Sequence, residues 1–272
     1  MFLSQTLDKD GHFPRLIDGG YLSWIFGTRP SFGSWSTVRF SYRDSLLLMD
    51  SRESSRREGF PAYKERRATK RKEDPKKKAT RDRVMRFATM LREDPIVETI
   101  DYPGAEADDL VALFWMAGHG KEGVIAVDKD LWQVPDLLEV MVGHHEEYAS
   151  DRFAKWCKKI PKYTERPVEP WQFVLHQCLF GDRSDSIPRL LPSRKVTEAR
   201  ELYKKTWKGG LSAGMEVFGM PFIQNLHLIL VPGPFLRIDY EQLKASPVEL
   251  MELVTTGEYW DSEMFDYPDR DW

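Results

Sequence analysis

Short apolar runs alternate with stretches of helical periodicity through the first two thirds of the chain. Four runs are predicted to be strands: Leu16–Ile17, Ser45–Met49, Val97–Ile100 and Val124–Val127. Apolar residues at helical spacing follow the first and third of these runs, at Tyr21–Phe26 and Ala105–Met116. Strands that alternate with helices predict an α/β fold with a mostly parallel central sheet flanked by helices.

The last third of the chain is predicted to consist of helices and loops. Pro170 opens a helix whose apolar side chains repeat at helical spacing, and Gly181 stands where a C-terminal cap is expected. From there to about residue 256 the sequence is helical and loop-rich, with several prolines as breaks. Residues 258–272 are acidic and aromatic. They are predicted to be a tail that is disordered, docks a partner or covers a groove.

Carboxylates are concentrated at the ends of these elements. They form five groups: Asp18; Asp50; Glu106, Asp108 and Asp109; Asp128 and Asp130; Asp182 and Asp185. Three of the groups come just after an apolar run, and open α/β sheets build their sites at the carboxyl ends of parallel strands. Carboxylates that are brought together repel one another, and a bound divalent cation is the usual resolution. The groups therefore predict a metal site, and the metal suggests chemistry on phosphate.

Each group also has an ordinary structural interpretation. An aspartate after a strand, such as Asp18 or Asp50, is most often a turn or cap residue, and the aspartates of the DKD sequence are equally ambiguous. Three carboxylates within positions 106–109 exceed what a helix cap requires. Asp182 and Asp185 would face the negative end of a helix dipole, and a nearby cation would offset the resulting repulsion. The coincidence of all groups with element ends favours a shared site.

The net charge of −3 hides a strongly basic segment. Residues 51–86 contain fifteen Lys and Arg against six Asp and Glu, a surplus of nine positive charges. Most such runs are solvated helix faces or flexible tails. In this one, Lys64 and Arg67 are three residues apart, on one side of a helix, near the rings of Phe60 and Tyr63. A positive segment beside an acidic metal site is what a phosphodiester substrate requires.

Several kinds of protein and site are excluded by what the sequence lacks. Cys157 and Cys178 are the only cysteines, too few for a disulfide framework or a zinc site, so we expect a reducing compartment. The first residues do not resemble a secretory signal and no apolar run is long enough for a membrane span, so we expect a cytoplasmic protein without membrane contact. His144 and His145 have no partners at zinc spacing and are expected at the surface. No nucleophile elbow, Walker A or Rossmann glycine pattern is present.

Five segments have a recognisable composition and order: LIDGGYL, LLLMDSRESSRREGFPAYKERR, GAEADDLVA, VDKDLWQV and GDRSDSIP. Together they resemble the motifs of the 5′-nuclease superfamily, which includes flap endonucleases, the 5′–3′ exonuclease domain of bacterial DNA polymerase I and the phage ribonuclease H-type 5′-exonucleases. The chain is most similar to the phage enzymes, over most of residues 15–200. The resemblance implies a PIN-like catalytic domain at 1–180 with a helical arch at about 51–90. A helical DNA-binding region of helix–three-turn–helix type would follow at 181–257.

The resemblance also implies two Mg²⁺ ions, with Mn²⁺ as a substitute, bound by the acidic groups. One ion would be held by Asp50, Glu106 and Asp108, with Asp18 acting partly through water. The other would be held or oriented by Asp128, Asp130, Asp182 and Asp185, with Asp108 as a bridge. Asp109, which belongs to the same EADD motif, is included among the candidate ligands.

The cations and the substrate follow from the same resemblance. Lys64 and Arg67 would neutralise charge that develops on the scissile phosphate. The candidate contacts to nucleic acid are Arg56, Arg57, Tyr63, Lys64, Arg67, Lys70 and Arg71. The implied substrate is DNA with a 5′ flap, a nick or a free 5′ end, and RNA–DNA hybrids are a further candidate. We expect a monomer that acts in primer removal or repair, in the host cytoplasm if the protein is viral, with a single-strand-binding protein as a candidate partner.

The chain departs from the family pattern in two places. The glycine-rich hairpin that follows the last motif is replaced by RLLPSRKVTEA. In the family that hairpin grips the downstream duplex and holds a potassium ion, so the K⁺ site is not expected here. The serine and glycine that precede DKD are replaced by Ala126 and Val127.

Two other functions agree with parts of the sequence. VIAVDKDL followed by GDRSD is superficially similar to the haloacid-dehalogenase-like phosphatases, in which the first aspartate is a nucleophile. That hypothesis leaves Asp50, the EADD motif and the basic segment unexplained, and the usual Thr or Val after DxD is missing. The third hypothesis is a nucleic-acid binding module with a decayed active site. Every expected ligand position is still acidic, which argues against this hypothesis.

Overall fold

The computed structural model describes residues 12–28, 35, 39–51, 54–65, 69, 75–134, 136–142, 149–167 and 169–233. The strands are β1 (Arg15–Asp18), β2 (Ser45–Met49), β3 (Glu98–Asp101), β4 (Gly123–Ile125) and β5 (Met141–Val142). The α-helices are α1 (Gly19–Thr28), α3 (Ser55–Gly59), α5 (Pro75–Glu93), α6 (Ala107–Met116), α7 (Leu137–Val140), α8 (Ala149–Cys157), α9 (Pro170–Phe180), α10 (Val196–Phe218) and α11 (Met220–Ile229). Two 3₁₀ helices are η3 (Arg39–Tyr42) and η4 (Lys129–Gln133). None of the described helices combines the length and apolarity needed to cross a membrane.

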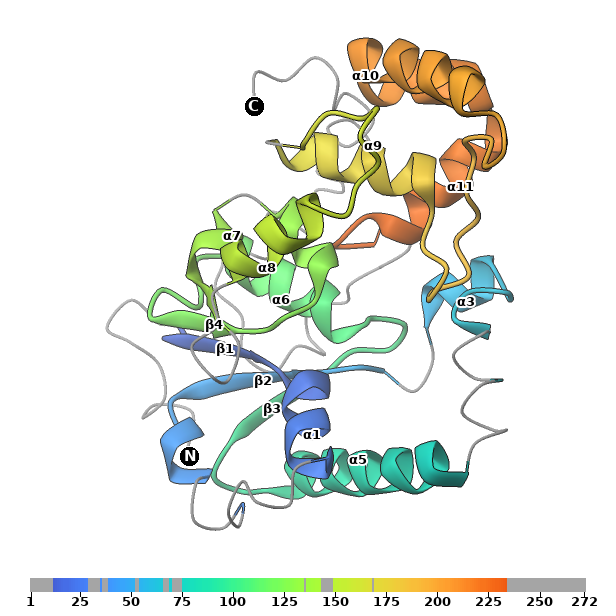
Figure 1. Ribbon diagram of the computed structural model, residues 1–272. Coiled ribbons are helices and arrows are strands. Elements are labelled where there is room, and N and C mark those ends of the chain that lie inside the picture. Colours follow the sequence, from blue (N-terminus) through green and yellow to red (C-terminus); the bar gives the residue numbers. More distant parts are fainter. Residues whose placement is uncertain are drawn as a thin grey trace.

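The strands form one parallel sheet in the order β3-β2-β1-β4-β5 (Figure 1). Leu16 of the central strand β1 lies opposite Leu46 of β2 and Val124 of β4. This architecture confirms the predicted α/β fold with a parallel sheet flanked by helices. Strand β5 was not predicted, because its two residues are too few to show a period.

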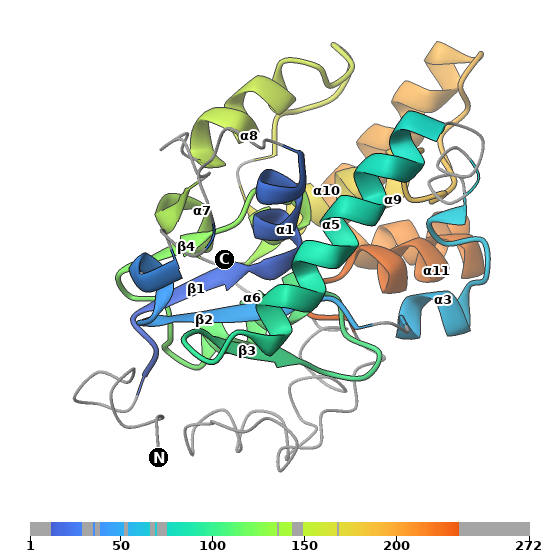
Figure 2. The same cartoon turned by 90° about the horizontal axis from the view of Figure 1, so that it is seen from below.

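Side chains of the sheet alternate between two faces, and helices cover both. Leu16 and Leu46 pack on one face in a core that includes residues of α6. Their neighbours Ile17 and Leu47 pack on the other face with residues of α1 and α5. Figure 2 shows the long helix α5 running alongside α1 on this side of the sheet. The uninterrupted apolar strands are therefore explained by burial on both faces.

The strand order places a topological switch point between β1 and β4. From β1 the chain proceeds through β2 to β3 on one side, and then returns to β4 and β5 on the other. The crevice at the carboxyl ends of the strands beside such a point is where open α/β sheets bind ligands. Asp18 is the last residue of β1 and Asp128 follows shortly after β4, so both lie at this crevice.

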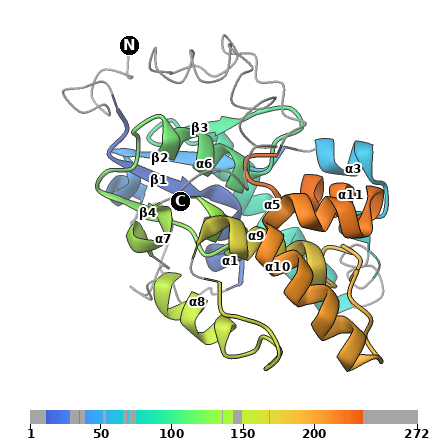
Figure 3. The same ribbon diagram turned by 90° about the horizontal axis from the view of Figure 1, so that it is seen from above.

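Helices α9, α10 and α11 form a second core beyond the sheet (Figures 1 and 3). Leu179, Tyr203 and Phe222 are buried in it. Helix α10 is interrupted at Gly210, whose φ of 64° and ψ of −152° are not helical. Figure 3 also shows α3 beside α11, and Tyr63, which follows α3, is buried in the same core. The basic segment is therefore attached at its start to the helical part of the protein.

Candidate active site

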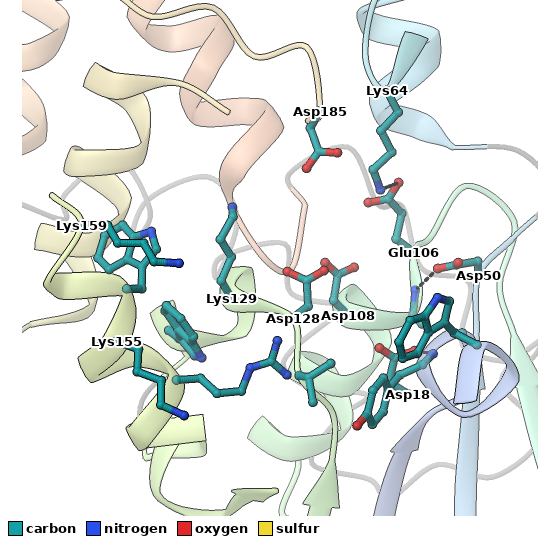
Figure 4. A pocket seen from close by; sticks show the side chains of 18 residues that line it. Asp18, Asp50, Lys64, Glu106, Asp108, Asp128, Lys129, Lys155, Lys159 and Asp185 are labelled. Atoms are coloured by element: carbon teal, nitrogen blue, oxygen red, sulfur yellow. Dashed lines mark hydrogen bonds and ion pairs between the residues drawn. The ribbon is translucent and has the colours of Figure 1, made fainter. Parts of the chain in front are cut away.

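A cavity of about 960 Å³ lies at the carboxyl ends of the central strands (Figure 4). Six of the predicted ligands line it: Asp18, Asp50, Glu106, Asp108, Asp128 and Asp185. The cations that line it are Lys64, Lys129, Arg152, Lys155 and Lys159. Asp109, Asp130 and Asp182 are not part of this lining. The fold thus brings residues from widely separated motifs into one space.

Asp108, Asp128 and Asp130 form a compact group that can hold a metal ion. One carboxylate oxygen from each lies within 4.8 Å of the others. Asp108 belongs to the first turn of α6, and Asp128 caps η4 by accepting the backbone N–H of Asp130 at 3.0 Å. Figure 4 shows Asp108 and Asp128 next to each other in the middle of the site. Oxygen ligands at this separation suit a single hard divalent cation, so Asp128 can be both a cap and a ligand.

Asp18 and Asp50 flank Gly20 at the other side of this group. Asp18 Oδ1 accepts the backbone N–H of Tyr21 at 2.9 Å, and Asp50 Oδ1 accepts that of Ala107 at 2.9 Å. A Cβ atom added to Gly20 would lie 3.2 Å from Asp18 Oδ1 and 3.3 Å from Asp50 Oδ2. The missing side chain at position 20 therefore leaves space between two carboxylates, which explains the need for a small residue after the strand.

The environment of the cavity disfavours the charged form of several carboxylates. Burial, reinforced by the charge of Asp50, raises the pKa of Asp18 to about 7. Burial also raises the pKa of Asp50, and burial together with the charge of Asp109 raises that of Asp108 well above its usual range. The pKa of Asp130 is raised by burial as well. A divalent cation would offset both the burial and the repulsion, so the residues present fit a metal.

Glu106 differs because the protein's own cations neutralise it. Its Oε1 accepts a hydrogen bond of 2.6 Å from Lys64 Nζ, and its Oε2 accepts bonds from Arg56 at 3.3 Å and the Tyr63 hydroxyl at 3.1 Å. Burial opposes the charge, but Lys64 and Arg56 outweigh it and lower the pKa of Glu106 to about 2. As a metal ligand, Glu106 would share its oxygens with these partners.

Asp109 lies behind the cavity in a buried ion pair with Arg56. The guanidinium donates two bonds of 2.7 Å to the two carboxylate oxygens and a third, of 2.6 Å, to the carbonyl of Leu230. Asp109 also accepts the backbone N–H groups of Glu106 and Gly233. Because Asp109 is fully buried and Arg56 is 3% exposed, the geometry argues against the predicted ligand role of Asp109 and against the predicted contact of Arg56 with nucleic acid.

Lys129 bridges Asp130 and Asp182. Its ammonium lies 2.7 Å from Asp130 Oδ1 and 2.8 Å from Asp182 Oδ2. Although burial opposes the charge of Asp182, Lys129 outweighs it, with help from Ser184, and lowers the pKa of Asp182 to about 2. A cation therefore already occupies the place between these two carboxylates, and a divalent ion could bind there only if Lys129 moved.

Loop 181–195 carries Asp185 to the cavity from the helical part. Gly181 caps α9 with a φ of 66°, and a Cβ there would lie 2.6 Å from the loop backbone, so glycine is required. Asn225 of α11 donates two hydrogen bonds of 2.8 Å, one to a carbonyl of α9 and one to a carbonyl of the loop. The backbone carbonyl of Asp185 accepts the N–H of Lys64 at 2.8 Å. The loop is thereby fixed between α11 and the basic segment.

The predicted cations of the basic segment are placed in different ways. Lys64 lies in a turn with a φ of 57°, so the helix face that we expected it to share with Arg67 is not formed at Lys64. Tyr63 is 3% exposed, which argues against direct contact with nucleic acid, whereas Arg57 is exposed on α3. Several predicted features lie outside the described residues: Arg67, Lys70, Arg71, His144, His145 and the tail 258–272.

The cations on the far side of the cavity are not part of the predicted site. Lys129 is part of the DKD motif but was not assigned a role. Arg152, Lys155 and Lys159 recur at intervals of three and four residues, which is a helical signal. The signal is short and follows no predicted strand, so the helix between β4 and α9 was not among the predicted elements.

Scans against protein-family profiles and curated protein sequences find no match. Solved structures do match. A structure of the bacteriophage T5 5′-exonuclease with bound zinc ions has a TM-score of 0.62 at 17% sequence identity, over 89% of this chain and 97% of that one. The chain therefore has the fold of this 5′-exonuclease. A complex of the bacteriophage T5 flap endonuclease with DNA and metal ions has a TM-score of 0.59 at 16% identity, over 93% and 95% of the two chains.

Proposed function

We propose that this protein is a divalent-metal-dependent 5′-nuclease that hydrolyses phosphodiester bonds of DNA. The observation that carries the proposal is the meeting of Asp18, Asp50, Asp108, Asp128 and Asp185 in one cavity at the switch point of the sheet. Support comes from the T5 structures of the same fold, which contain divalent metal ions and, in one case, DNA.

The carboxylates have separate tasks in this proposal. Asp108, Asp128 and Asp130 hold one ion, because their oxygens already lie within 4.8 Å of one another. Asp18 and Asp50 hold a second, in the space left by the missing side chain of glycine between them. The residues that orient these ligands are Glu106, Asp182 and Asp185. Mg²⁺ is the ion proposed, with Mn²⁺ as a substitute.

When bound, two divalent ions would lower the pKa of water and stabilise the leaving oxygen. Lys64 contributes a fixed positive charge beside them. Burial opposes this charge, but Glu106 outweighs it and raises the pKa of Lys64 well above its usual range. The ammonium therefore remains protonated at neutral pH and can neutralise charge that develops on a phosphate. Arg67 shares this task in the proposal.

The proposal extends to substrate and setting. The substrate is DNA with a 5′ flap, a nick or a free 5′ end, and RNA–DNA hybrids are a second substrate to be tested. This reaction would serve primer removal during replication or repair, by a monomer in the cytoplasm, with a single-strand-binding protein as a candidate partner. The proposal includes no K⁺ ion, because the glycine-rich hairpin of the family is missing from loop 181–195.

The proposal is tested with 5′-labelled flap, nicked duplex and RNA–DNA hybrid substrates in Mg²⁺. We expect Asp128→Ala and Asp130→Ala to abolish cleavage and to leave DNA binding largely intact, because they remove ligands without removing cations. Product lengths distinguish exonuclease from flap endonuclease action. Full activity of both variants at saturating Mg²⁺ would contradict the assignment of Asp128 and Asp130 as metal ligands. Activity on a small phosphate ester, with none on the nucleic-acid substrates, would favour a phosphatase.

A further inference from the structure

The cavity has a second positively charged wall that the sequence motifs do not include. It is formed by Arg152 and Lys155 of α8 and by Lys159 just after that helix, and we call these three residues the α8 wall. Figure 4 shows Lys155 and Lys159 on the side of the cavity away from Lys64, with the central carboxylates in between. Cations therefore stand on both sides of the acidic centre.

The three cations occupy one face of a continuous helical stretch. Residues three and four apart on a helix are neighbours on its surface, and Arg152, Lys155 and Lys159 have this spacing. A hydrogen bond of 2.8 Å from the N–H of Lys159 to the carbonyl of Trp156 continues the helical turn beyond the end of α8. Lys158 is exposed and does not line the cavity, so the neighbouring lysine faces elsewhere.

Aromatic packing holds this helix in place against the rest of the site. The Trp156 ring lies 5.2 Å from that of Phe173 in α9, and the Phe153 ring lies 5.0 Å from that of Trp132 in η4. Edge-to-face contacts at these distances each contribute about 0.5–1.5 kcal/mol beyond burial. The α8 wall is therefore presented from a fixed surface, and Trp132 lies two residues after the DKD motif.

Two cations of the α8 wall, Arg152 and Lys159, differ from the other cations of the cavity in their partners. Lys64 and Lys129 are already committed to ion pairs with carboxylates. Among the residues that the structure describes, no carboxylate lies within ion-pair distance of Arg152 or Lys159. An anion that enters the cavity would therefore meet positive charge at Arg152 and Lys159 that no described carboxylate neutralises.

We propose that the α8 wall binds the phosphate backbone of a single nucleic-acid strand and holds it across the carboxylates; this rests on the proposed function. A phosphodiester strand is repelled by the acidic centre, and cations beside it offset that repulsion. A cavity of about 960 Å³ has the size of a small-ligand pocket, so it can enclose a few nucleotides of one strand and is too small to enclose a duplex. Contacts of this kind fix position and do not read sequence.

The test is a binding measurement in EDTA, so that no cleavage occurs. Fluorescence anisotropy is followed with a labelled single strand, a 5′-flap substrate and a blunt duplex at several salt concentrations. The triple variant Arg152→Gln, Lys155→Gln, Lys159→Gln is expected to bind the single strand and the flap at least about tenfold more weakly at 0.1 M salt. The slope of log affinity against log salt concentration should be shallower by about two units for this variant. Each phosphate contact to a single strand contributes about 0.7 to that slope, and three contacts are removed.

Lys158→Gln is the matched control, because it removes one positive charge from the same stretch outside the cavity. It is expected to bind within about twofold of the unaltered protein. A second triple variant, Arg152→Lys, Lys155→Arg, Lys159→Arg, keeps the charge and should restore both affinity and slope. Unfolding curves of all variants verify that they are folded.

Three outcomes decide between the possibilities. Equal affinity and slope for the triple glutamine variant and Lys158→Gln would overturn the α8 wall as a binding surface. An equal loss on blunt duplex would overturn its assignment to a single strand. The triple glutamine variant could lose binding while the unaltered protein cleaves none of the substrates. That result would support the α8 wall as a binding surface and contradict the nuclease function, so the two proposals can fail separately.

Discussion

Two groups of carboxylates meet at this site, and they differ in what neutralises them. The paired group consists of Glu106, Asp109 and Asp182, whose partners are Arg56, Lys64 and Lys129. The central group consists of Asp18, Asp50 and Asp108. Fixed cations lower the pKa of Glu106 and Asp182 despite burial, whereas burial raises the pKa of every member of the central group. The protein thus supplies the countercharge for one group and leaves that of the other to an ion from solution.

The largest effect is expected from breaking the paired group. Arg56→Met should lower the free energy of unfolding by about 3–5 kcal/mol, because Asp109 would remain buried without a countercharge. Urea denaturation followed by fluorescence measures this change. Arg57→Met is the matched control, since Arg57 is exposed on the same helix, and it should change the free energy by less than about 0.5 kcal/mol. Similar stability of the two variants would show that the ion pair is not structural.

The central group is expected to respond to pH and metal together. The folded-state pKa of Asp18 is about 7 against an ordinary value of 3.8. Between these values the folded state keeps a proton that the unfolded state has lost, so this group's contribution to stability decreases as pH rises. A divalent ion replaces that proton, and we expect Mg²⁺ to stabilise the protein more at pH 8 than at pH 5.5. At 100 times its Kd the ion would add about 2.7 kcal/mol.

Thermal unfolding with and without Mg²⁺ at the two pH values measures this difference. The comparison must be made between pairs of curves, because His176 acts in the opposite direction. Burial lowers the pKa of His176 to about 3, so its contribution to stability is lost as pH falls below 6.5 whether or not metal is present. A metal-induced shift of equal size at both pH values would show that the central carboxylates are not the ligands.

The smallest effect is expected from filling the space between Asp18 and Asp50. In Gly20→Ala the new methyl group would press on both carboxylates, and we expect the affinity for Mg²⁺ to fall about tenfold, or about 1.4 kcal/mol. The stability of the metal-free protein should be equal or slightly higher, because alanine favours the helix that begins here. Titration calorimetry and thermal unfolding measure the two quantities. Unchanged affinity would separate Gly20 from the metal site.

The central group was accessible from the sequence because each member follows a local signal. Asp18 and Asp50 end apolar runs that became β1 and β2, and Asp108 lies in the first turn of a helix with a clear apolar face. Parallel strands then place these positions at one edge without further information. Asp185 follows the glycine cap of α9, which was also expected.

The ion pairs of the paired group were not accessible from the sequence, although its carboxylates were among the candidate ligands, because most of the partners are distant in the chain and are chosen by packing. Arg56 and Asp109 are 53 residues apart, and nothing in the basic segment distinguishes Arg56 from the exposed Arg57. The left-handed turn at Lys64 likewise depends on contacts with the helical part. Short elements such as β5 have too few residues to show a hydrophobic period. Helix α8 was not predicted, although its cations have helical spacing.

The segment that follows α11 has a consequence for how the protein is made. Leu230 and Gly233 provide a carbonyl to Arg56 and an N–H to Asp109, and the N–H of Val231 bonds to Gln133 beside the DKD motif. The ion pair behind the cavity is therefore completed by residues synthesised long after β1. During translation this ion pair cannot gain its last hydrogen bonds until residue 233 has left the ribosome. Chains that end between residues 185 and 230 would then carry every candidate metal ligand and still lack the last partners of the buried ion pair.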